Sequence, residues 1–526
     1  MRRGFWRGDG DIKLIDNLGD LKHQISEFFT SYARSLSDCQ YADIRIEISD
    51  TRWASAEDGK PKSAGKDEGG SFGIRVIAGG EKKAPGYYGS IFSIKDLHRI
   101  NDLIKDGLNH AHARATANSK HKSRVAASIE GLGNILYSTE LANIEIHRDT
   151  VPAVFKISPE SVSPQDILLF VEDASKSVRD ISDIKFNDVT AYTQYLGTLF
   201  INTEGALIDQ YYAYSQGNVY VVASGKEGQQ ELYEYIGDQR GWEAVSGGVN
   251  AMEMNLLDFS MRVAMDAAAL SDAKMLKTTE KEVVVVTDPY FNTLLSHEII
   301  GHPMEADRVL KYETAYAGRS WFYKGLNENY IGKQVASPLI TTYSDPALPG
   351  YGHYVYDHEG TKGKKVVHME NGVLRDFMNS RQTASLLGMS PNGSYTATDA
   401  SLVPLIRMST TVFANGKTDP KKIIGDISDG YYLWGMHTPS ISESRENFTM
   451  SAIKTYRIHR GEITELYRGG GISADSMSFL MSIDAVGNDF KIYPIANCGK
   501  GQPMQTKRLG NGGPTLRGRA RVVGGS

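Results

Sequence analysis

Hydrophobic and polar positions in the first half of the chain follow two different periods. Residues 20–36 place their large apolar side chains on one helical stripe, which predicts an amphipathic helix. Residues 42–48 (ADIRIEI) instead alternate between apolar and charged side chains, which predicts a half-buried β-strand. Two further helices are expected over residues 95–117 and 164–178. The second follows Ser163-Pro164, and proline is favoured in the first turn of a helix.

The segments between these helices have the composition of loops and short strands. Residues 57–70 (EDGKPKSAGKDEGG) are polar and rich in glycine, so we predict a loop there and a strand over 71–78. From 181 to 237, short apolar runs with turn residues every eight to twelve positions predict a series of strands in an antiparallel meander.

The second half of the chain combines one long helix with many strands. Residues 250–271 predict a helix, and the apolar run at 283–286 predicts a buried strand. Two similar hairpins are expected, with Asn371-Gly372 and Arg460-Gly461 at their turns. The predicted fold class is therefore α+β with two domains. Residues 1–245 would form a mixed α/β domain, and residues 246–526 a β-rich domain that carries a kinked metal-binding helix.

Composition and charge narrow the possible functions. The 526 residues are 40% hydrophobic and 23% charged, with a net charge of −5, which gives no reason to expect binding to nucleic acid or to an acidic membrane. The most basic stretch, from Lys507 to Arg521, is predicted to be a solvated terminus. No apolar run is long enough to span a membrane, and no apolar run follows the basic residues at the start, so no secretory leader is expected. Two cysteines are too few for a disulfide framework, which favours a cytoplasmic location.

The strongest chemical signal is the motif His297-Glu298-x-x-x-His302. Residues five apart lie about 140° apart around a regular helix, too far to share one metal ion. Gly301 and Pro303 supply a reason for irregularity, so we expect a widened turn, or a break at Gly301, that brings the two histidines together. The alternative is an ordinary helix with two hydrogen-bonded histidines and a solvated glutamate.

A metal site of this kind has a clear chemistry. Two imidazoles suit Zn²⁺, and Glu298, next to the first histidine, could accept a proton from water without binding the ion. Catalytic zinc takes a third protein ligand. Spacing does not choose among the downstream candidates, which are Glu305, Asp307, His353, His358, His368, His437, His459 and Cys498. The polar glycine loop around Cys498 favours that thiol, and Lys500 beside it would favour a thiolate.

Several motifs appear in a fixed order: SHEIIGHPMEADRV, YDHEGTKG, HMENGVLRDFM, SRQTASLLGMSPNG, PLIRMSTTVF, TYRIHRGEI and NCGKGQ. Together they resemble the TldD/PmbA family of metalloproteases, specifically over about 280–516 and more loosely before that. The resemblance implies one zinc ion per chain, held by His297, His302 and Cys498, with Glu298 as general base. It implies a two-domain α+β fold and a homodimer, or a heterodimer with a related metal-free subunit.

Two departures from the family pattern stand out. The family commonly has C-G-K-x-G-Q, whereas Lys500 is followed here directly by Gly501. The stretch after Gly393 usually carries two arginines and here reads SYTATDAS, so specificity is expected to differ if those arginines touch substrate or partner.

The favoured function is a zinc peptidase that acts on short or unfolded peptides. One alternative is a non-proteolytic, regulatory peptide binder, in which an edge strand captures the peptide and zinc is structural. Glu298 discriminates the two, because a structural zinc site needs no adjacent carboxylate and usually has four protein ligands. A third role, suggested by an older family label, is modulation of DNA gyrase through protein contact.

Overall fold

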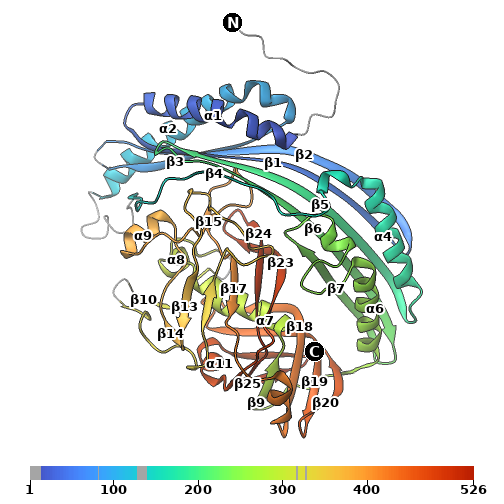
Figure 1. Cartoon of the computed structure of the whole chain (residues 1–526). Helices are drawn as coiled ribbons and strands as arrows, with labels where there is room; N and C mark the ends of the chain where they lie inside the picture. The colour runs from blue at the N-terminus through green and yellow to red at the C-terminus, as the bar shows by residue number, and fades with distance from the viewer. Residues whose placement is uncertain (1–13, 81, 127–138, 316–317, 326–327, 526) are drawn as a thin grey trace.

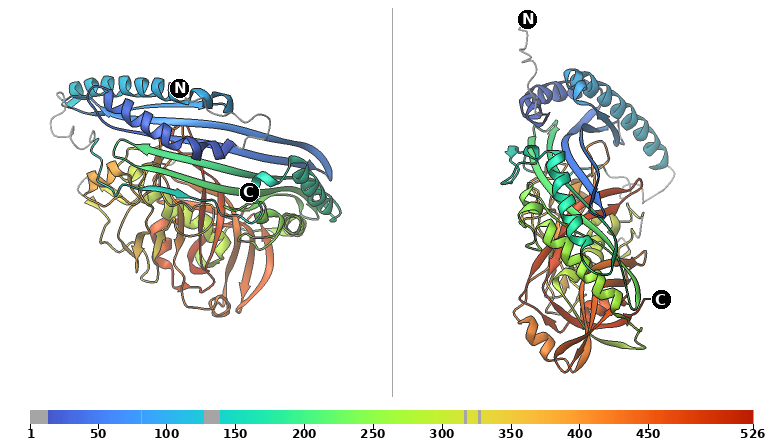
Figure 2. Two further views of the ribbon diagram at one scale, coloured as in Figure 1. Left: turned by 45° about the horizontal axis from the view of Figure 1, so that its top comes forward. Right: turned by 90° about the vertical axis from the view of Figure 1, so that its right-hand side faces the viewer.

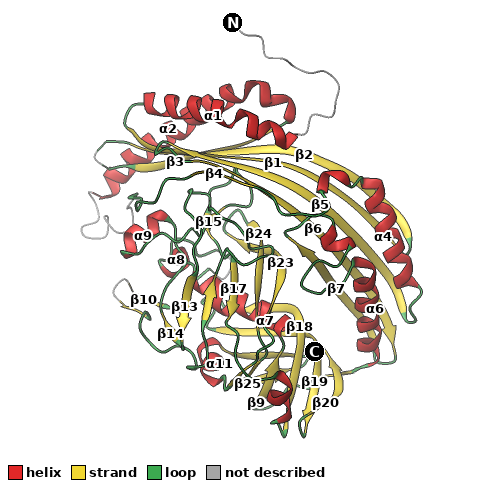
Figure 3. Ribbon diagram, in the orientation of Figure 1, coloured by secondary structure: helices red, strands yellow, loops and turns green. Residues whose placement is uncertain are grey.

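The structure is a computed structural model, and it describes residues 14–80, 82–126, 139–315, 318–325 and 328–525. Long, curved strands of an N-terminal sheet arch over a C-terminal part that is rich in shorter strands (Figure 1). Helices cover the outer face of the arch, as the colouring in Figure 3 shows. The predicted α+β class is confirmed. Among the described helices, none is both long and apolar enough to cross a membrane.

The N-terminal sheet has the order β3-β2-β1-β5-β6, and β4 and β7 both pair with β6. Its neighbours in this order are antiparallel, whereas β4 runs parallel to β6. The strands are β1 (Cys39–Glu57), β2 (Lys60–Ala78), β3 (Ala84–Phe92), β4 (Arg148–Val151), β5 (Ile184–Asn202), β6 (Leu207–Gly225) and β7 (Gly228–Asp238).

The helices pack on one face of this sheet, because apolar side chains point to that face at every second position of the strands. Ile44, Ile46 and Ile48 of β1 are buried in a core with α1 (Leu14–Ser35) and α2 (Ile100–Ala126). Farther along the same face lie α4 (Pro164–Arg179) and α6 (Leu256–Asp272), which share a second core with β5, β6 and β7. Figure 2 shows this helix layer from two further sides. The predicted helix start is confirmed: Ser163 caps α4 by accepting a hydrogen bond from the N–H of Asp166.

The strands are longer than the sequence pattern predicts. Residues 57–70 are not a loop: Asp58 and Gly59 turn with positive φ, and the polar residues after them extend β2 alongside β1. The short strands predicted from 181 onward are joined into two long ones up to residue 225, because β5 continues through Gly197 and β6 through Gly217. Many side chains of β5 and β6 that point away from the helices are polar. That face of the two strands contacts the C-terminal part of the chain instead of solvent.

The C-terminal part contains, within the described residues, an eight-stranded sheet and a six-stranded sheet. In the first, β18 pairs with both β9 and β19, so the path β18-β9-β25-β21-β19 closes on itself. In the second, the order is β14-β13-β12-β17-β24-β23. The bounds are β9 (Glu282–Thr287), β12 (Thr342–Ser344), β13 (Val366–Glu370), β14 (Val373–Leu374), β17 (Thr410–Phe413), β18 (Asp429–Ile441), β19 (Asn447–His459), β20 (Glu462–Arg468), β21 (Gly471–Asp475), β23 (Lys491–Lys500), β24 (Gln505–Gly513) and β25 (Leu516–Val523).

Both predicted hairpins are confirmed, β13–β14 and β19–β20, with Asn371 and Arg460 at positive φ in the turns. The remaining helices and short elements are η1 (Ile94–Arg99), η2 (Pro159–Ser161), α5 (Glu243–Ser246), β8 (Lys274–Met275), α7 (Pro289–Leu295), η3 (Ser296–Gly301), η4 (His302–Met304), α8 (Ala306–Val309), β10 (Tyr323–Gly325), β11 (Glu328–Asn329), α9 (Arg381–Leu387), β15 (Tyr395–Thr396), β16 (Leu405–Ile406), α10 (Pro420–Gly425), α11 (Ser476–Ser482) and β22 (Ala485–Val486).

The basic stretch from Lys507 to Arg521 is not a solvated terminus, contrary to the prediction. Lys507 and Arg508 lie on β24, and β25 pairs with β9, β21 and β22. The alternation of basic residues with apolar or small ones in RGRARVV is the alternation of a strand with one buried face.

The two parts of the chain are joined by buried charges. Arg75 of β2 lies 2.8 Å from Glu359 of the C-terminal part and also pairs with Asp43 of β1. Arg45 donates to the carbonyl of Leu402 at 3.0 Å. The charged positions of the 42–48 strand thus face the C-terminal part, which covers them. The domain boundary near residue 245 stays a prediction.

Candidate metal centre

The helix that carries the motif begins at a buried cap. Asp288 precedes α7, and its carboxylate accepts hydrogen bonds from the N–H groups of Phe291, at 2.7 Å, and Gly435, at 3.0 Å. Burial raises the pKa of Asp288 to about 6, although these hydrogen bonds act in the opposite direction. Pro289 occupies the first turn, where its missing N–H costs nothing.

The five-residue spacing of the histidines is accommodated by a π-helical turn. In η3 the N–H of His302 bonds to the carbonyl of His297, five residues back, so the turn is wider than in an α-helix. The two imidazole rings consequently lie with their centroids 4.7 Å apart. The expected widening is observed, whereas the chain does not break at Gly301, whose φ of −56° is helical.

Gly301 is needed for a close approach. A Cβ at this position would lie 1.8 Å from the sulfur of the buried Met408, which precedes β17. Glycine therefore allows the π-helical turn to pack directly against that segment.

Cys498 of β23 completes a group of three side chains. The donor atoms of His297, His302 and Cys498 all lie within 4.8 Å of one another, and the Cys498 Sγ is 3.3 Å from the His302 Nε2. The three residues are only 2–3% exposed. Burial alone would raise the pKa of the Cys498 thiol, but His302, His297 and Arg407 lower it well below its usual value. Burial would lower the pKa of His297, but Cys498 raises it.

Two further side chains orient the imidazoles. The Nδ1 of His297 lies 3.2 Å from the Oδ1 of Asn511, and the Nδ1 of His302 lies 3.1 Å from the Oε2 of Glu305. Because the Nδ1 atom of each histidine is hydrogen-bonded to Asn511 or Glu305, the Nε2 atom is the one that faces Cys498. Acceptors of this kind fix the tautomer of metal-binding histidines.

Glu305 and Asp307, two of the candidate third ligands, are engaged elsewhere. Lys500 lies 3.1 Å from Glu305 and 2.7 Å from Asp307, and Arg308 donates to Glu305 at 2.8 Å. Burial disfavours an ionised Glu305, but Lys500, His302 and Arg308 outweigh it and hold its pKa well below the usual value. Lys500 was expected to favour a thiolate at Cys498, but its ammonium group faces these two carboxylates instead.

The other candidate histidines do not join the group. His353 and His358 line a separate cavity, and His368 bonds to the hydroxyl of Ser344 at 2.7 Å. His437 contacts Thr438, and His459 is exposed at the end of β19.

Glu298 is oriented by Arg445, which sequence reasoning missed. The Arg445 Nη1 forms an ion pair with the Glu298 Oε2, and Arg445 lies in the turn between β18 and β19 with a positive φ of 62°. Burial would raise the pKa of Glu298, but Arg445, His297 and His302 lower it to about 2. The carboxylate is therefore ionised, and its side chain keeps 12% of its surface exposed.

Comparisons with known proteins follow the same order along the chain. Residues 42–115, 157–275 and 280–524 match the models for PmbA/TldA metallopeptidase domain 1, central domain and C-terminal domain. A protein named metalloprotease from Methanothermobacter thermautotrophicus is 26% identical over 487 residues, 93% of this chain and 96% of that relative. A protein named zinc metalloprotease TldD homolog from Saccharolobus solfataricus is 27% identical over 493 residues, 92% of this chain and 96% of that relative.

Two solved structures share the fold at lower identity. TldE from Thermococcus kodakarensis superposes with a TM-score of 0.68 at 17% identity, over 95% of this chain and 99% of that one. A Thermotoga maritima protein, titled as a candidate modulator of a DNA gyrase, superposes with a TM-score of 0.69 at 15% identity, over 95% of this chain and all of that one. Three consecutive domain models and relatives matched over nearly their whole length lead to one conclusion: the chain belongs to the PmbA/TldD family of metallopeptidases.

Proposed function

We propose that the protein is a zinc-dependent peptidase, with His297, His302 and Cys498 as metal ligands and Glu298 as general base. The observation that carries this proposal is the buried group of two imidazoles and one thiol beside an ionised carboxylate. The relative from Saccharolobus solfataricus is itself named a zinc metalloprotease, which supports the choice of metal.

The donor set fits zinc. Tetrahedral zinc with ordinary Zn–N and Zn–S bonds holds its ligand atoms about 3.4–3.6 Å apart. The Cys498 Sγ and His302 Nε2, 3.3 Å apart, are close to that spacing, and the whole group lies within 4.8 Å. Within the described residues the group contains three side chains, which corresponds to a catalytic site with an open fourth position.

Each residue then has a defined task. A zinc ion bound here would act as a Lewis acid toward water and toward the carbonyl of the scissile bond. Asn511 and Glu305 hold the two imidazoles in the orientation that presents Nε2. Glu298 accepts a proton from the attacking water and returns it to the leaving amine. Arg445 keeps Glu298 ionised and fixes its direction.

The burial of the site bears on substrate size. Side chains that are 2–3% exposed are not accessible to the surface of a folded protein, so the substrate in this proposal is a short or unfolded peptide. We further propose that the chain works as a homodimer, or as a heterodimer with a related metal-free subunit, whose second subunit encloses the site.

Replacing Glu298 tests the proposal directly. Glu298→Gln preserves the shape of the side chain but cannot accept the proton, so peptide cleavage should fall about 10²–10⁴-fold while bound zinc is retained. His297→Ala should lose zinc and cleavage together. Glu280→Gln, at an exposed position, serves as the matched control and should match the parent protein. Zinc is measured by metal analysis, and cleavage by mass spectrometry of an unstructured peptide.

The competing role is a peptide-binding, regulatory protein with structural zinc. It predicts that Glu298→Gln leaves every activity unchanged, and that the parent protein with full zinc cleaves no peptide, alone or with its partner. Either result would overturn the peptidase proposal.

A further inference from the structure

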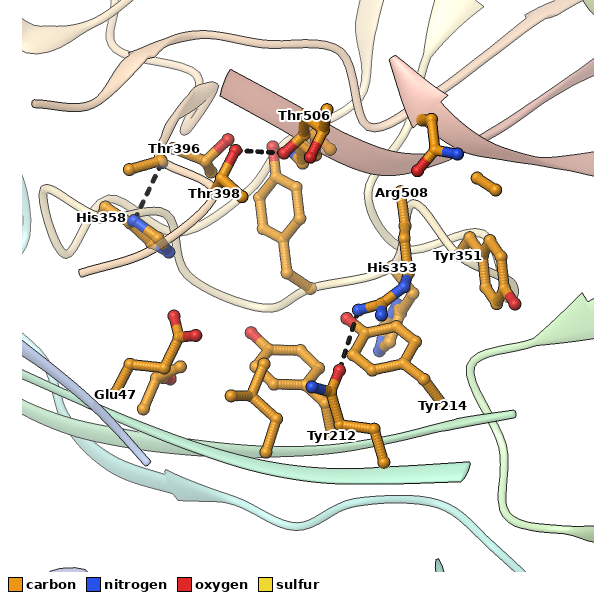
Figure 4. Close-up of a pocket in the computed structure, with 18 of the residues that line it drawn as sticks. Glu47, Tyr212, Tyr214, Tyr351, His353, His358, Thr396, Thr398, Thr506 and Arg508 are labelled. Carbon is orange, nitrogen blue, oxygen red and sulfur yellow. Dashed lines mark hydrogen bonds between the residues drawn. The ribbon is translucent and has the colours of Figure 1, made fainter. Parts of the chain in front are cut away.

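A cavity of about 310 Å³ lies between the inner face of the N-terminal sheet and the C-terminal part (Figure 4). This is within the range of small-ligand sites. None of the four residues proposed for the metal centre lines it. Its walls are aromatic, with Tyr192, Tyr212, Tyr214, Tyr351, Tyr354 and Tyr356.

One end of the cavity carries an acid without a partner. Glu47 belongs to the face of β1 opposite the helices, and it extends from the sheet into the cavity (Figure 4). Among the described residues it has no hydrogen bond or ion pair. Burying a carboxyl group without a hydrogen-bond partner costs folding free energy, unless a ligand in the cavity binds the group.

The other end carries a guanidinium without an anion. Arg508 of β24 donates through Nε to the hydroxyl of Tyr192, at 3.2 Å, and through Nη1 to Gln194, at 3.0 Å. Its guanidinium carbon lies 4.6 Å from the centre of the Tyr214 ring. Among the described residues no carboxylate lies within ion-pair distance, and Nη2 has no hydrogen-bond partner. A guanidinium held in this way is suited to binding a carboxylate.

Two histidines that line the cavity offer one hydrogen-bond donor and one acceptor to a ligand. His358 accepts a hydrogen bond at Nδ1 from the N–H of Ala397, at 3.1 Å, so its proton is on Nε2. Burial lowers the pKa of His358 to about 3, which keeps the ring neutral. His353 lies 2.7 Å through Nδ1 from the carbonyl of Pro346, so Nδ1 carries the proton and, in the neutral ring, Nε2 is an acceptor. The C=O of a peptide group needs a hydrogen-bond donor and its N–H needs an acceptor, and the two histidines offer one of each.

We propose that this cavity binds a short peptide with free termini, its ammonium group at Glu47 and its carboxylate at Arg508. An anion alone would leave the Glu47 carboxyl group without a partner, and a cation alone would meet the charge of Arg508, so a ligand with both charges matches both ends of the cavity. The stacked rings of Tyr212 and Tyr214, 6.0 Å apart between centroids, lie between the charged ends and supply an apolar and cation-binding wall. The cavity shares none of the four residues proposed for the metal centre, although Asn497 adjoins Cys498 and Lys507 lies opposite Cys498 in the β23–β24 pair.

Binding at Glu47 should release a proton. Burial and Asp399 raise the pKa of Glu47 to about 8, and Arg508 only partly opposes them. Tyr212 and Tyr214 face Glu47 across the cavity, and Arg45, Asp357 and His358 line an adjoining pocket with it. Lys507 lines the same cavity, and burial lowers its pKa to about 7. At pH 7 the free protein therefore holds Glu47 mostly protonated, and an ammonium group beside it favours the carboxylate. When the peptide binds at pH 7, Glu47 should then release close to one proton.

The experiment uses the tripeptide Ala-Phe-Ala and isothermal titration calorimetry in two buffers of different ionisation enthalpy. The full-length, zinc-loaded Glu298→Gln protein is used, and mass spectrometry verifies that the peptide stays intact. We expect Glu47→Gln to weaken binding at least tenfold and to abolish proton release. We expect Arg508→Gln to weaken binding at least tenfold with proton release retained.

Modified peptides separate the two ends. The N-acetylated tripeptide should bind weakly and be insensitive to Glu47→Gln, and the C-terminal amide should bind weakly and be insensitive to Arg508→Gln. Glu462→Gln and Arg148→Gln, both at exposed positions, are the matched controls. Melting temperatures verify that each variant folds.

Three results would overturn the proposal: no binding of the free tripeptide at millimolar concentration, equal binding of the capped and free peptides, or binding that survives both cavity variants. Binding that depends on His297 and not on Glu47 would place the peptide at the metal centre instead. Loss of cleavage in Glu298→Gln has no bearing on this site, so the two proposals fail separately.

Discussion

At the scale of single residues, the assignment of Cys498 as third ligand gives the first prediction. Cys498→Ser should fold but bind zinc much more weakly, because the change removes a soft, charged donor. Zinc content after dialysis against a weak chelator measures the effect. Cys39→Ser, which alters the other cysteine and lies outside the group, should retain zinc like the parent. Equal zinc in Cys498→Ser and the parent protein would move the third ligand elsewhere.

A second residue-scale prediction concerns the orientation of His297. Asn511→Leu removes the acceptor 3.2 Å from Nδ1, so the ring loses its fixed tautomer and direction. Zinc affinity should fall about 10–100-fold, as is typical when such an outer partner is lost. Competition with a fluorescent chelator measures the affinity. Unchanged affinity, in a variant with the parental melting temperature, would show that Asn511 does not orient the ligand.

The sequence predicted the residues that the structure brings together at the candidate site, but not the residues around them. His297, Glu298 and His302 stand out because they are close together in the chain, and Cys498 was favoured by its loop and by family resemblance. Asn511 and Arg445 carry no local signal, since they are 214 and 147 residues from the groups they contact. Such contacts depend on strand pairing, which periodicity does not determine.

At the scale of elements, the π-helical turn depends on Gly301. In Gly301→Ala the new Cβ would lie 1.8 Å from the sulfur of Met408, so the turn or the methionine must move. Overpacking of this kind typically costs about 1–3 kcal/mol, and the shift should also weaken zinc binding. Gly425→Ala, in α10 with no atom within 4 Å of the new Cβ, is the matched control. Thermal unfolding and zinc analysis measure both effects, and a Gly301→Ala protein as stable as this control would contradict the prediction.

The cap of α7 gives a prediction about pH. The folded-state pKa of Asp288 is about 6, above the unfolded value of about 3.9, so the folded protein binds more protons between these values. Stability should therefore fall as pH rises from about 4 to 6. Asp288→Asn keeps the acceptor without the charge, and at pH 7 it should be more stable than the parent by up to about 3 kcal/mol. Urea unfolding at pH 4 and pH 7 tests this. A stability difference between variant and parent that does not grow with pH would contradict it.

The bounds of helices and turns were predicted correctly where they depend on interactions between residues close together in the chain. The Ser163-Pro164 helix start and the Asn371-Gly372 turn were correct because capping and turn preferences act over a few residues. The prediction for the basic stretch after Lys507 was wrong for the opposite reason, because β24 and β25 pair with β17 and β9, which lie far back in the chain. The loop predicted over residues 57–70 was wrong because that part of β2 pairs with β1 while most of its side chains are polar and exposed, so no apolar alternation marks the strand.

At the scale of the whole molecule, the proposed enclosure of the site by a second subunit predicts a dimer. Light scattering of the purified chain, alone and with a related metal-free chain, should give the mass of two subunits in at least one case. The dimer should cleave unstructured peptides and leave folded proteins intact. A monomer that cleaves folded proteins would contradict both the assembly and the substrate class.

The pairing of the last strands has a consequence for biosynthesis. The histidines at 297 and 302 leave the ribosome long before Cys498. Later still come β24, which packs against the motif helix, and β25, which pairs with the preceding strand β9. A growing chain therefore cannot assemble the three donors until translation has passed Cys498. Incomplete products, such as those of stalled translation, would remain inactive toward neighbouring nascent polypeptides, which are themselves unfolded chains.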